Sequence, residues 1–356
     1  MSRAIHLTST LTRTYPWLTA PLIISAPMRI MSGPALAVAV SRAGGLGFLG
    51  PNTTTQNIAT DLAEVSSLLQ SPHPPLPGSP TSHLPIGVGF QLWSDDLNTA
   101  ITTIKQYRPC AVWLFAPANG QSDLDTWSAR IRAAVPGTQI WVQIGTVSEA
   151  TTLLSGREKP DAVVVQGAEA GGHGRANDGM GLMVLLPEIA DVLAGSGIMV
   201  FGAGGIADGR GAAAALCLGA EGVVMGTRFL AAEEARISKG YQGEVVRVRD
   251  GAVMTTRTLL YNHLRGTFGW PQEYSPRTIV NRSWREFQAG RAFEELKRLH
   301  DEALKAGDEG WGAEGRLATY AGAAVGLIHE VKDAGTIVRE VREQVWERLG
   351  GEKGRL

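Results

Sequence analysis

Eight short runs of apolar residues, rich in β-branched side chains, recur along the first two thirds of the chain. Most of them are continuously apolar, which is typical of parallel strands that are covered on both faces. The runs that we predict as strands cover residues 22–26, 46–49, 86–90, 111–115, 139–144, 162–165, 198–202 and 222–226. The pattern therefore predicts a parallel sheet without tight antiparallel hairpins.

Segments with helical spacing of apolar residues separate these strands. The predicted helices cover residues 35–42, 55–69, 95–106, 124–134, 148–154, 183–194 and 209–218. A helix after almost every strand makes a series of βα units, and eight such units are typical of a (β/α)8 TIM barrel. An open doubly wound sheet could hold the same number of strands and is the alternative.

Two segments break this rhythm. Residues 71–85 contain six prolines, which predicts an extended surface loop that joins neither a sheet nor a helix. After about residue 238 the strands stop, and helical spacing within 287–305 and 335–349 indicates helices. We therefore expect a barrel domain over residues 1–237, a smaller helical domain over 238–330, and a final helix within 331–356 that returns to the barrel.

The composition excludes several classes of protein. Hydrophobic residues make up 44% and charged residues 19%, so the chain can bury a large core. The 33 basic and 34 acidic residues nearly cancel, which argues against a nucleic-acid-binding surface, and no apolar run is long enough to span a membrane. Cys110 and Cys217 are too few for a disulfide framework and favour a reducing compartment.

These observations favour a cytoplasmic protein, which we expect to be a monomer or a homodimer. Two terminal signals give alternatives. Residues 1–17 are rich in Ser and Thr and contain no acidic residue, which resembles a mitochondrial transit peptide. The final residues Gly354, Arg355 and Leu356 resemble a peroxisomal targeting signal.

Glycine is the unusual feature of the composition. The chain contains 44 glycines in 356 residues, about 12% against a usual roughly 7%. Several lie in residues 201–209 and 225–229, which follow the last two predicted strands and run directly into helices. There the backbone N–H groups of the loop and the positive end of a helix dipole are expected to cradle a phosphate. The pattern from Gly202 to Ala207 also matches a relaxed dinucleotide fingerprint, but that motif belongs to a first βα unit and here six precede it.

A glycine-rich segment also follows the sixth strand and surrounds one histidine. Gly171, Gly172 and Gly174 flank His173, so backbone and ligand can approach the imidazole, which takes or gives a proton near neutral pH. The alternative is a surface-loop histidine without a role. No His or Cys spacing in the chain suggests a metal site. Gln143 and Gln166 end the fifth and sixth strands, where their amides could reach a heterocycle.

The first strand ends in Ala26, Pro27 and Met28. Proline suits a position where a strand stops and the chain turns across the barrel mouth. Met28 could pack against a ring system or simply fill the core. Four aromatic residues are candidates for apolar walls of a pocket, with core packing as the alternative for each: Trp93, Trp113, Tyr261 and Trp270.

Taken in order, these motifs resemble those of the nitronate monooxygenases, formerly called 2-nitropropane dioxygenases. The resemblance covers the whole barrel and rests on Ala26-Pro27-Met28, Gln166-Gly167-x-x-Ala170-Gly171-Gly172-His173, Ala203-Gly204-Gly205-Ile206 and Met225-Gly226-Thr227-Arg228-Phe229. It implies FMN as cofactor. Ala26, Pro27 and Met28 would line the isoalloxazine ring of FMN. The residues that would contact the ring or the ribityl chain are Gln91, Gln143, Gln166, Gly171 and Gly172. The phosphate would be held by Ala203, Gly204, Gly205, Gly226 and Thr227.

The resemblance also implies a reaction. Family members oxidise alkyl nitronates with O2 to a carbonyl compound and nitrite through one-electron transfer to the flavin. His173 would act as base on a neutral nitroalkane or position the nitronate. Two alternatives stay open: an NAD(P)H-dependent FMN reductase of quinones or enoyl thioesters, and a flavin-binding barrel without catalytic activity.

Overall fold

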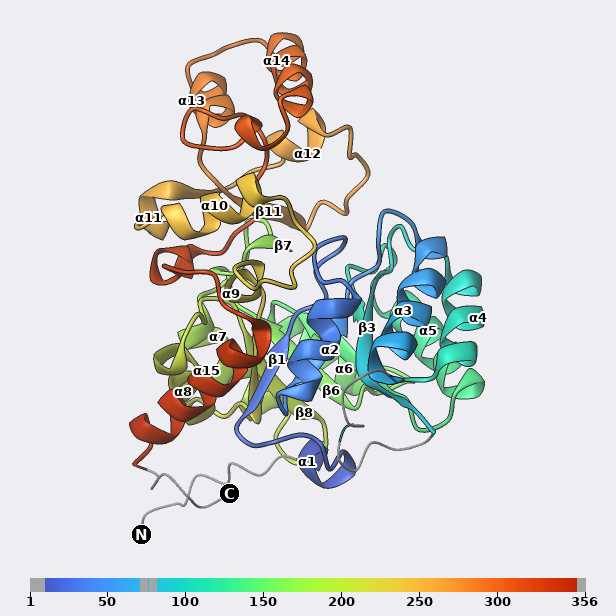
Figure 1. The fold of residues 1–356 in the computed structure, drawn as a ribbon. Helices are drawn as coiled ribbons and strands as arrows, with labels where there is room; N and C mark the ends of the chain where they lie inside the picture. The colour runs from blue at the N-terminus through green and yellow to red at the C-terminus, as the bar shows by residue number, and fades with distance from the viewer. Residues whose placement is uncertain (1–9, 71–75, 77–81, 351–356) are drawn as a thin grey trace.

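Eight parallel strands form a closed barrel in the computed structural model, which describes residues 10–70, 76 and 82–350. Strand β1 pairs with both β2 and β9, which closes the sheet (Figure 1). The barrel strands are β1 (Leu22–Ser25), β2 (Leu46–Leu49), β3 (Leu84–Gln91), β4 (Pro109–Phe115), β5 (Gln139–Ile144), β6 (Ala162–Gln166), β8 (Met199–Ala203) and β9 (Gly222–Met225). The predicted (β/α)8 barrel is confirmed, and the open sheet is excluded.

The barrel strands are continuously apolar because they pack on both sides. Their outward side chains form one core with the surrounding helices, and their inward side chains form a second core. Large aromatic rings fill this interior: Trp141 stacks on Phe201 with ring centroids 4.5 Å apart. Helix α1 (Thr10–Thr14) lies beneath the barrel in Figure 1, where the nearby Tyr15 hydroxyl donates to the Cys110 carbonyl at 3.0 Å.

Helices surround the barrel in the order that the sequence predicts. They are α2 (Pro34–Arg42), α3 (Ile58–Gln70), α4 (Leu97–Tyr107), α5 (Gln121–Ala134), α6 (Val147–Ser155), α7 (Leu182–Val192) and α8 (Gly209–Cys217), with a 3-10 turn at Thr55–Asn57 before α3. Helix α15 (Ala334–Arg348) packs between α8 and α2. Its Arg342 is buried and donates to the carbonyls of Ala43 and Gly44 at 3.0 and 2.9 Å.

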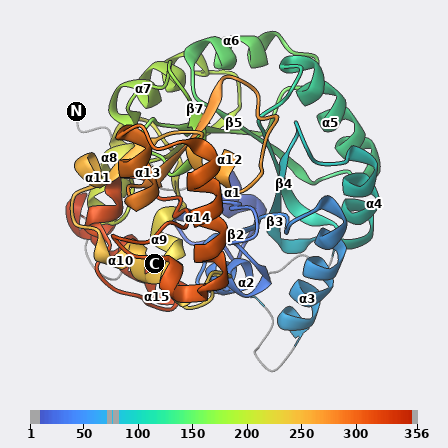
Figure 2. The ribbon, with the colours of Figure 1, turned by 90° about the horizontal axis from the view of Figure 1, so that it is seen from above.

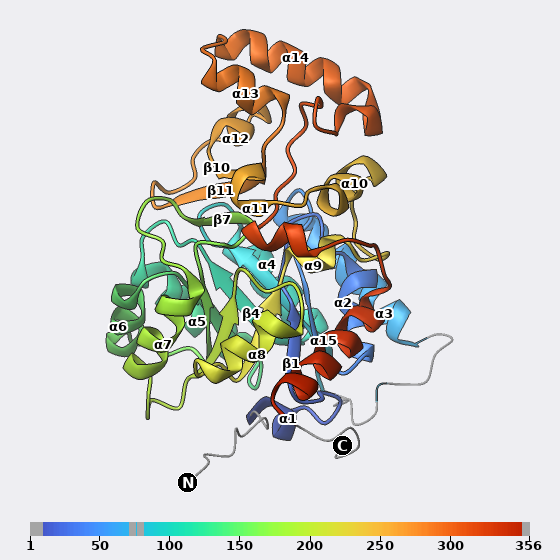
Figure 3. The ribbon, with the colours of Figure 1, turned by 90° about the vertical axis from the view of Figure 1, so that its left-hand side faces the viewer.

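A C-terminal lobe covers part of the barrel mouth, as the view from above and the side view show (Figures 2 and 3). Its helices are α9 (Thr227–Leu230), α10 (Lys239–Arg247), α11 (Gly251–Met254), α12 (Leu260–Leu264), α13 (Arg282–Gln288) and α14 (Phe293–Lys305), with 3-10 turns at Gly307–Gly310 and Ala323–Leu327. The lobe is not purely helical. Strands β10 (Thr255–Arg257) and β11 (Tyr274–Ile279) form an antiparallel sheet with β7 (Gly172–Arg175), which leaves the barrel after β6.

Three local expectations differ from the structure. His173 lies in strand β7 and not in a loop, because β11 supplies a pairing partner from far along the chain. The last residues of the proline-rich segment belong to the sheet, because Pro85 lies in β3. It sits at a register shift, where proline does not have to donate a hydrogen bond to the neighbouring strand. Residues 71–75 and 77–81 of this segment lie outside the described residues. The pattern over 287–305 is divided between α13 and α14, with Gly290 at φ +86° between them.

The contacts of Arg342 predict a stabilising role for α15. We expect Arg342→Met to lower the free energy of unfolding by about 2 kcal/mol, because charge-assisted hydrogen bonds to two buried carbonyls are lost. Urea unfolding followed by circular dichroism measures the change. Arg339→Met on the exposed side of the same helix is the control and should change stability by less than about 0.5 kcal/mol. Equal losses in the two variants would contradict the prediction.

Candidate active site

One large cavity lies between the barrel mouth and the C-terminal lobe. Its volume is about 1240 Å³, which exceeds the roughly 300–1,000 Å³ of ordinary small-molecule pockets and leaves room for a cofactor together with a second small molecule. All residues that the sequence singled out as a site line it: Ala26, Pro27, Met28, Gln91, Gln143, Gln166, Gly171, Gly172, His173, Ala203, Gly204, Gly205, Gly226 and Thr227. The cavity therefore brings the ends of six barrel strands together with β7.

The turn after β8 is built for a ligand that contacts the backbone. Gly204 and Gly205 have φ values of +100° and +71°, and a Cβ at Gly204 would lie 3.0 Å from the Gly167 carbonyl oxygen. Within the described residues, the N–H groups of Gly204, Gly205 and Gly226 have no hydrogen-bond partner. Successive left-handed residues with free N–H groups form a concavity that suits an anion.

The expected contribution of a helix N-terminus after β8 is corrected by the structure. Helix α8 begins with its own cap, because the Asp208 carboxylate accepts from the Arg210 N–H at 2.8 Å and also pairs with the Arg210 guanidinium. The helix after β9, α9, is only four residues long. An anion at this place would therefore be held by loop N–H groups and the Thr227 hydroxyl, and not by a long helix dipole.

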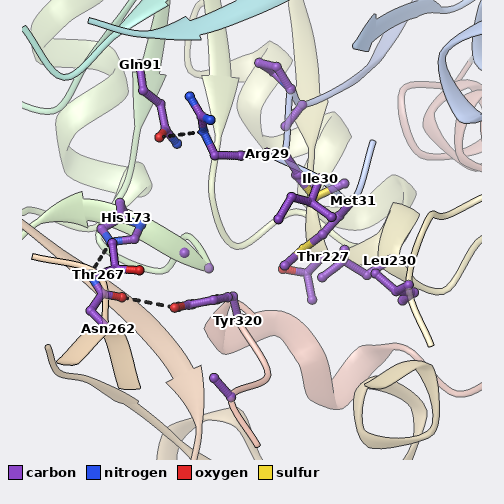
Figure 4. Close-up of a pocket in the computed structure, with 18 of the residues that line it drawn as sticks. Arg29, Ile30, Met31, Gln91, His173, Thr227, Leu230, Asn262, Thr267 and Tyr320 are labelled. Atoms are coloured by element: carbon purple, nitrogen blue, oxygen red, sulfur yellow. Dashed lines mark hydrogen bonds between the residues drawn. The ribbon is translucent and has the colours of Figure 1, made fainter. Parts of the chain in front are cut away.

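A tightly held segment after β1 forms another wall. The Ser32 hydroxyl oxygen accepts from the Met28 N–H at 2.7 Å, and the Ile30 carbonyl accepts from Arg236, which pairs with Asp61 at 2.9 Å. Ile30 has φ +69°, a costly conformation for a β-branched residue that persists only where its surroundings hold it. The segment is therefore fixed in place beside the cavity (Figure 4).

Each glutamine at the barrel mouth has one end of its amide engaged by the protein. Gln91 accepts from Arg29 at 3.1 Å, and Arg29 also pairs with the buried Asp95 (Figure 4). The Gln143 oxygen accepts from the Trp113 indole N–H at 3.1 Å, and Gln166 donates to the His173 carbonyl at 3.1 Å. Among the residues that the structure describes, the NH2 groups of Gln91 and Gln143 and the oxygen of Gln166 have no hydrogen-bond partner.

The His173 imidazole is stacked and desolvated. Its ring lies parallel to the Trp270 indole, with centroids 3.5 Å apart and an interplanar angle of 5°. Burial, with smaller contributions from the positive charges of Arg257 and Arg265, lowers the pKa of His173 from 6.5 to about 3. The ring is therefore neutral over the physiological pH range.

The lobe supplies site residues that sequence reasoning missed. Asn262, Arg265 and Tyr320 line the cavity and form a hydrogen-bonded chain that reaches His173. Figure 4 shows its part from Tyr320 through Asn262 to His173. No periodicity or glycine motif marks them, since they are scattered over the irregular lobe. Of the candidate aromatic walls, Trp93, Trp113 and Trp270 line the cavity. Tyr261 does not: its hydroxyl donates to Asn281 inside the lobe at 2.6 Å.

A comparison with known protein families supports the family that the strand-end glycines, the histidine and the glutamines resemble. The sequence model of nitronate monooxygenase matches residues 12–75 and 93–269. The chain belongs to the nitronate monooxygenase family. It is 59% identical over 335 residues to the nitronate monooxygenase npaC of Metarhizium robertsii, an alignment that covers 94% of this chain and 93% of that relative. At this similarity the protein is an oxidoreductase of the nitronate monooxygenase kind, with a small-molecule substrate.

Two solved structures with different names have a fold similar to that of this chain. FabK from Thermotoga maritima superposes with a TM-score of 0.72 at 26% identity and covers 96% of this chain and 98% of its own. A nitroalkane oxidase from Streptomyces ansochromogenes superposes with a TM-score of 0.71 at 25% identity and covers 95% and 98%. This chain thus shares its architecture, including the C-terminal lobe, with both structures.

The described residues contain neither a cluster of metal-ligating side chains nor a helix suited to a membrane. Over residues 10–70, 76 and 82–350, no group of three or more His, Cys, Asp or Glu is placed to hold a metal ion. Within the same residues, no helix has the length and apolar character needed to cross a membrane.

The low pKa of His173 predicts a pH dependence of stability. Below about pH 6.5 the unfolded chain protonates this histidine while the folded protein does not, so acidification favours unfolding. Between pH 7 and pH 5, the wild type should lose about 2 kcal/mol more free energy of unfolding than His173→Asn, which lacks the group. Urea unfolding at the two pH values measures this difference, and parallel losses in both proteins would contradict a desolvated imidazole.

Proposed function

We propose that this protein binds FMN at the barrel mouth and oxidises alkyl nitronates with O2 to a carbonyl compound and nitrite. The observation that carries the proposal is a single cavity that combines a cradle of unpaired backbone N–H groups with a neutral histidine and buried arginine charge. The relative from Metarhizium robertsii supports the reaction class.

The residues present fit FMN. Within the part of the chain that the structure describes, the N–H groups of Gly204, Gly205 and Gly226 are free to bind a phosphate, and Thr227 adds a hydroxyl. A Cβ at Gly226 would lie 3.5 Å from the Met28 sulfur and 3.7 Å from the Ala26 Cβ, so the phosphate cradle adjoins the apolar wall expected to face the ring. The free amide ends of Gln143 and Gln166 suit a heterocycle with both donors and acceptors. When bound, FMN would supply the one-electron acceptor that the reaction needs.

Electrostatics in the cavity favour an anionic substrate. The Arg257 guanidinium donates hydrogen bonds to the carbonyls of Gly172 and Ser275, and the Arg265 guanidinium donates to the Tyr320 hydroxyl. In the part of the chain that the structure describes, neither arginine forms an ion pair with a carboxylate. Burial and the neighbouring Arg277 lower the pKa of Arg257 to about 10, so its side chain is still charged at neutral pH. This uncompensated positive charge stabilises a nitronate beside His173 and opposes an imidazolium.

The FMN proposal predicts a charge effect at Gly226. A Cβ there would meet only Met28 and Ala26, both at ordinary contact distance, so we expect Asn and Asp to be accommodated equally because they have nearly the same shape. We expect Gly226→Asp to weaken FMN binding at least about tenfold more than Gly226→Asn, since the added carboxylate repels the phosphate. Titration of FMN fluorescence gives both Kd values. Equal Kd values would place the phosphate elsewhere.

The reaction itself is tested by oxygen uptake with the purified protein and added FMN. Propyl nitronate should support uptake with stoichiometric nitrite, while NADH with a quinone or an enoyl thioester should not be consumed rapidly. NADH oxidation without nitronate turnover would instead favour the alternative, an NAD(P)H-dependent FMN reductase. Neither activity, with no FMN bound, would indicate a barrel without this catalytic role.

A further inference from the structure

A chain of three side chains from the lobe ends on the His173 ring. The Arg265 guanidinium donates to the Tyr320 hydroxyl oxygen at 3.0 Å, and the Tyr320 hydroxyl donates to Asn262 Oδ1 at 3.0 Å. Asn262 Nδ2 lies 2.8 Å from His173 Nε2 (Figure 4). Asn262 is 1% exposed, so its amide is shielded from solvent and depends on these partners.

The direction of this relay is set at its arginine end. A guanidinium only donates, so the Tyr320 oxygen accepts there and its single proton points to Asn262. The Asn262 oxygen receives that proton, which leaves the NH2 group to face His173. An amide NH2 has no lone pair to accept with, so His173 Nε2 must accept, and the proton of the neutral ring resides on Nδ1.

The other ring nitrogen is left for a ligand. Among the described residues, Nδ1 of His173 has no hydrogen-bond partner, and the histidine lines the cavity. With its proton there, Nδ1 is a donor and not a base. To accept a proton at Nδ1, the ring would have to carry its proton on Nε2, directly opposite the NH2 group of Asn262.

None of the described residues around the ring would reverse this state. The charged and titratable groups that face the ring in this part of the chain are Arg257 from β10, Arg265 from the end of α12, and Tyr320. Both arginines are cationic, and together with burial they depress the pKa of His173. Trp270 covers one ring face and contributes no acceptor in the ring plane. A neutral ring with a fixed tautomer is therefore the state that the site supports.

We propose that the Arg265–Tyr320–Asn262 relay holds His173 as its Nδ1–H tautomer, so that the ring donates a hydrogen bond to a nitronate oxygen and does not deprotonate neutral nitroalkanes. The three lobe residues are positioning residues that select a preformed anion. The identity of the ligand rests on the proposed function, whereas the tautomer is a property of this chain alone.

The tautomer can be observed without turnover. Full-length protein labelled with 15N-histidine gives two-bond 1H–15N correlations whose pattern distinguishes Nδ1–H, Nε2–H and doubly protonated rings. The signals of His173 are assigned by their loss in His173→Gln. We expect the Nδ1–H pattern at pH 7, with and without FMN. An Nε2–H or doubly protonated ring in the wild type would overturn the proposal.

Asn262→Asp reverses the relay with almost no change in shape. Its carboxylate accepts from both Tyr320 and His173, so the ring should change to Nε2–H at pH 7, because burial and the two arginines still oppose a second proton. Tyr320→Phe removes the proton that orients Asn262 and should give a mixture of tautomers. Tyr261→Phe is the matched control, because it removes a buried hydroxyl from α12, the helix that carries Asn262, without removing a hydrogen bond of the relay. An unchanged Nδ1–H pattern in Asn262→Asp, or a shift in the control equal to that in Tyr320→Phe, would overturn the assignment.

The kinetic readout separates this inference from the proposed function. A positioned base accelerates proton abstraction on the order of 10²-fold or more. Because an Nε2–H ring leaves Nδ1 free to act as a base, Asn262→Asp should raise the ratio of kcat/KM for nitroethane to that for ethyl nitronate at least about tenfold. Rate loss with an unchanged ratio would overturn the role in selection. If the wild type oxidises no nitronate yet shows the Nδ1–H pattern, the proposed function fails and the relay stands. If it oxidises nitronates with an Nε2–H ring, the relay fails and the function stands.

Discussion

The pairing of β7 with β11 is the constraint on which the active site depends. Strand β7 comes directly from the barrel and β11 from the lobe, and their antiparallel register sets His173 opposite Pro276. Arg257 on β10 reinforces the junction by donating to the carbonyls of Ala168 and Ala170 at 3.1 and 3.2 Å. The lobe is therefore a wall of the site, since it supplies Asn262, Trp270 and Tyr320, which contact the His173 ring.

This junction also explains the electrostatics of the cavity. Arginines that bond to carbonyls can cross the interface without carboxylate partners, because each carbonyl contributes part of the compensation. The remaining positive potential acts on whatever occupies the cavity. It adds to the effect of burial, which is the main reason that an imidazolium is costly at His173, and the same positive charge would favour a bound anion there.

The sequence predicted the barrel and the strand-end residues that line the cavity, but not the lobe residues beside them, and this division has a physical basis. Strand runs and helical spacing repeat along the barrel, and glycines at strand ends are conspicuous because composition is unusual there. Strand β7, with the sequence Gly-His-Gly-Arg, has almost no intrinsic strand preference and forms because β11 pairs with it. Asn262, Arg265 and Tyr320 follow no period, and their role comes from contacts between segments as far as 89 residues apart. Only tertiary structure brings such residues together.

The two parts of the site have different tolerance for change. A cradle of backbone N–H groups needs glycines and open space, so its chemistry is the same wherever the turn is kept. Proton position at His173 depends instead on side chains from the lobe, each of which can be replaced without altering the barrel. FabK and the nitroalkane oxidase superpose on this chain about equally well, so the fold does not distinguish their reactions from each other. The residues able to do so are those that the lobe places against β7, where a single amide decides which nitrogen of the histidine carries the proton.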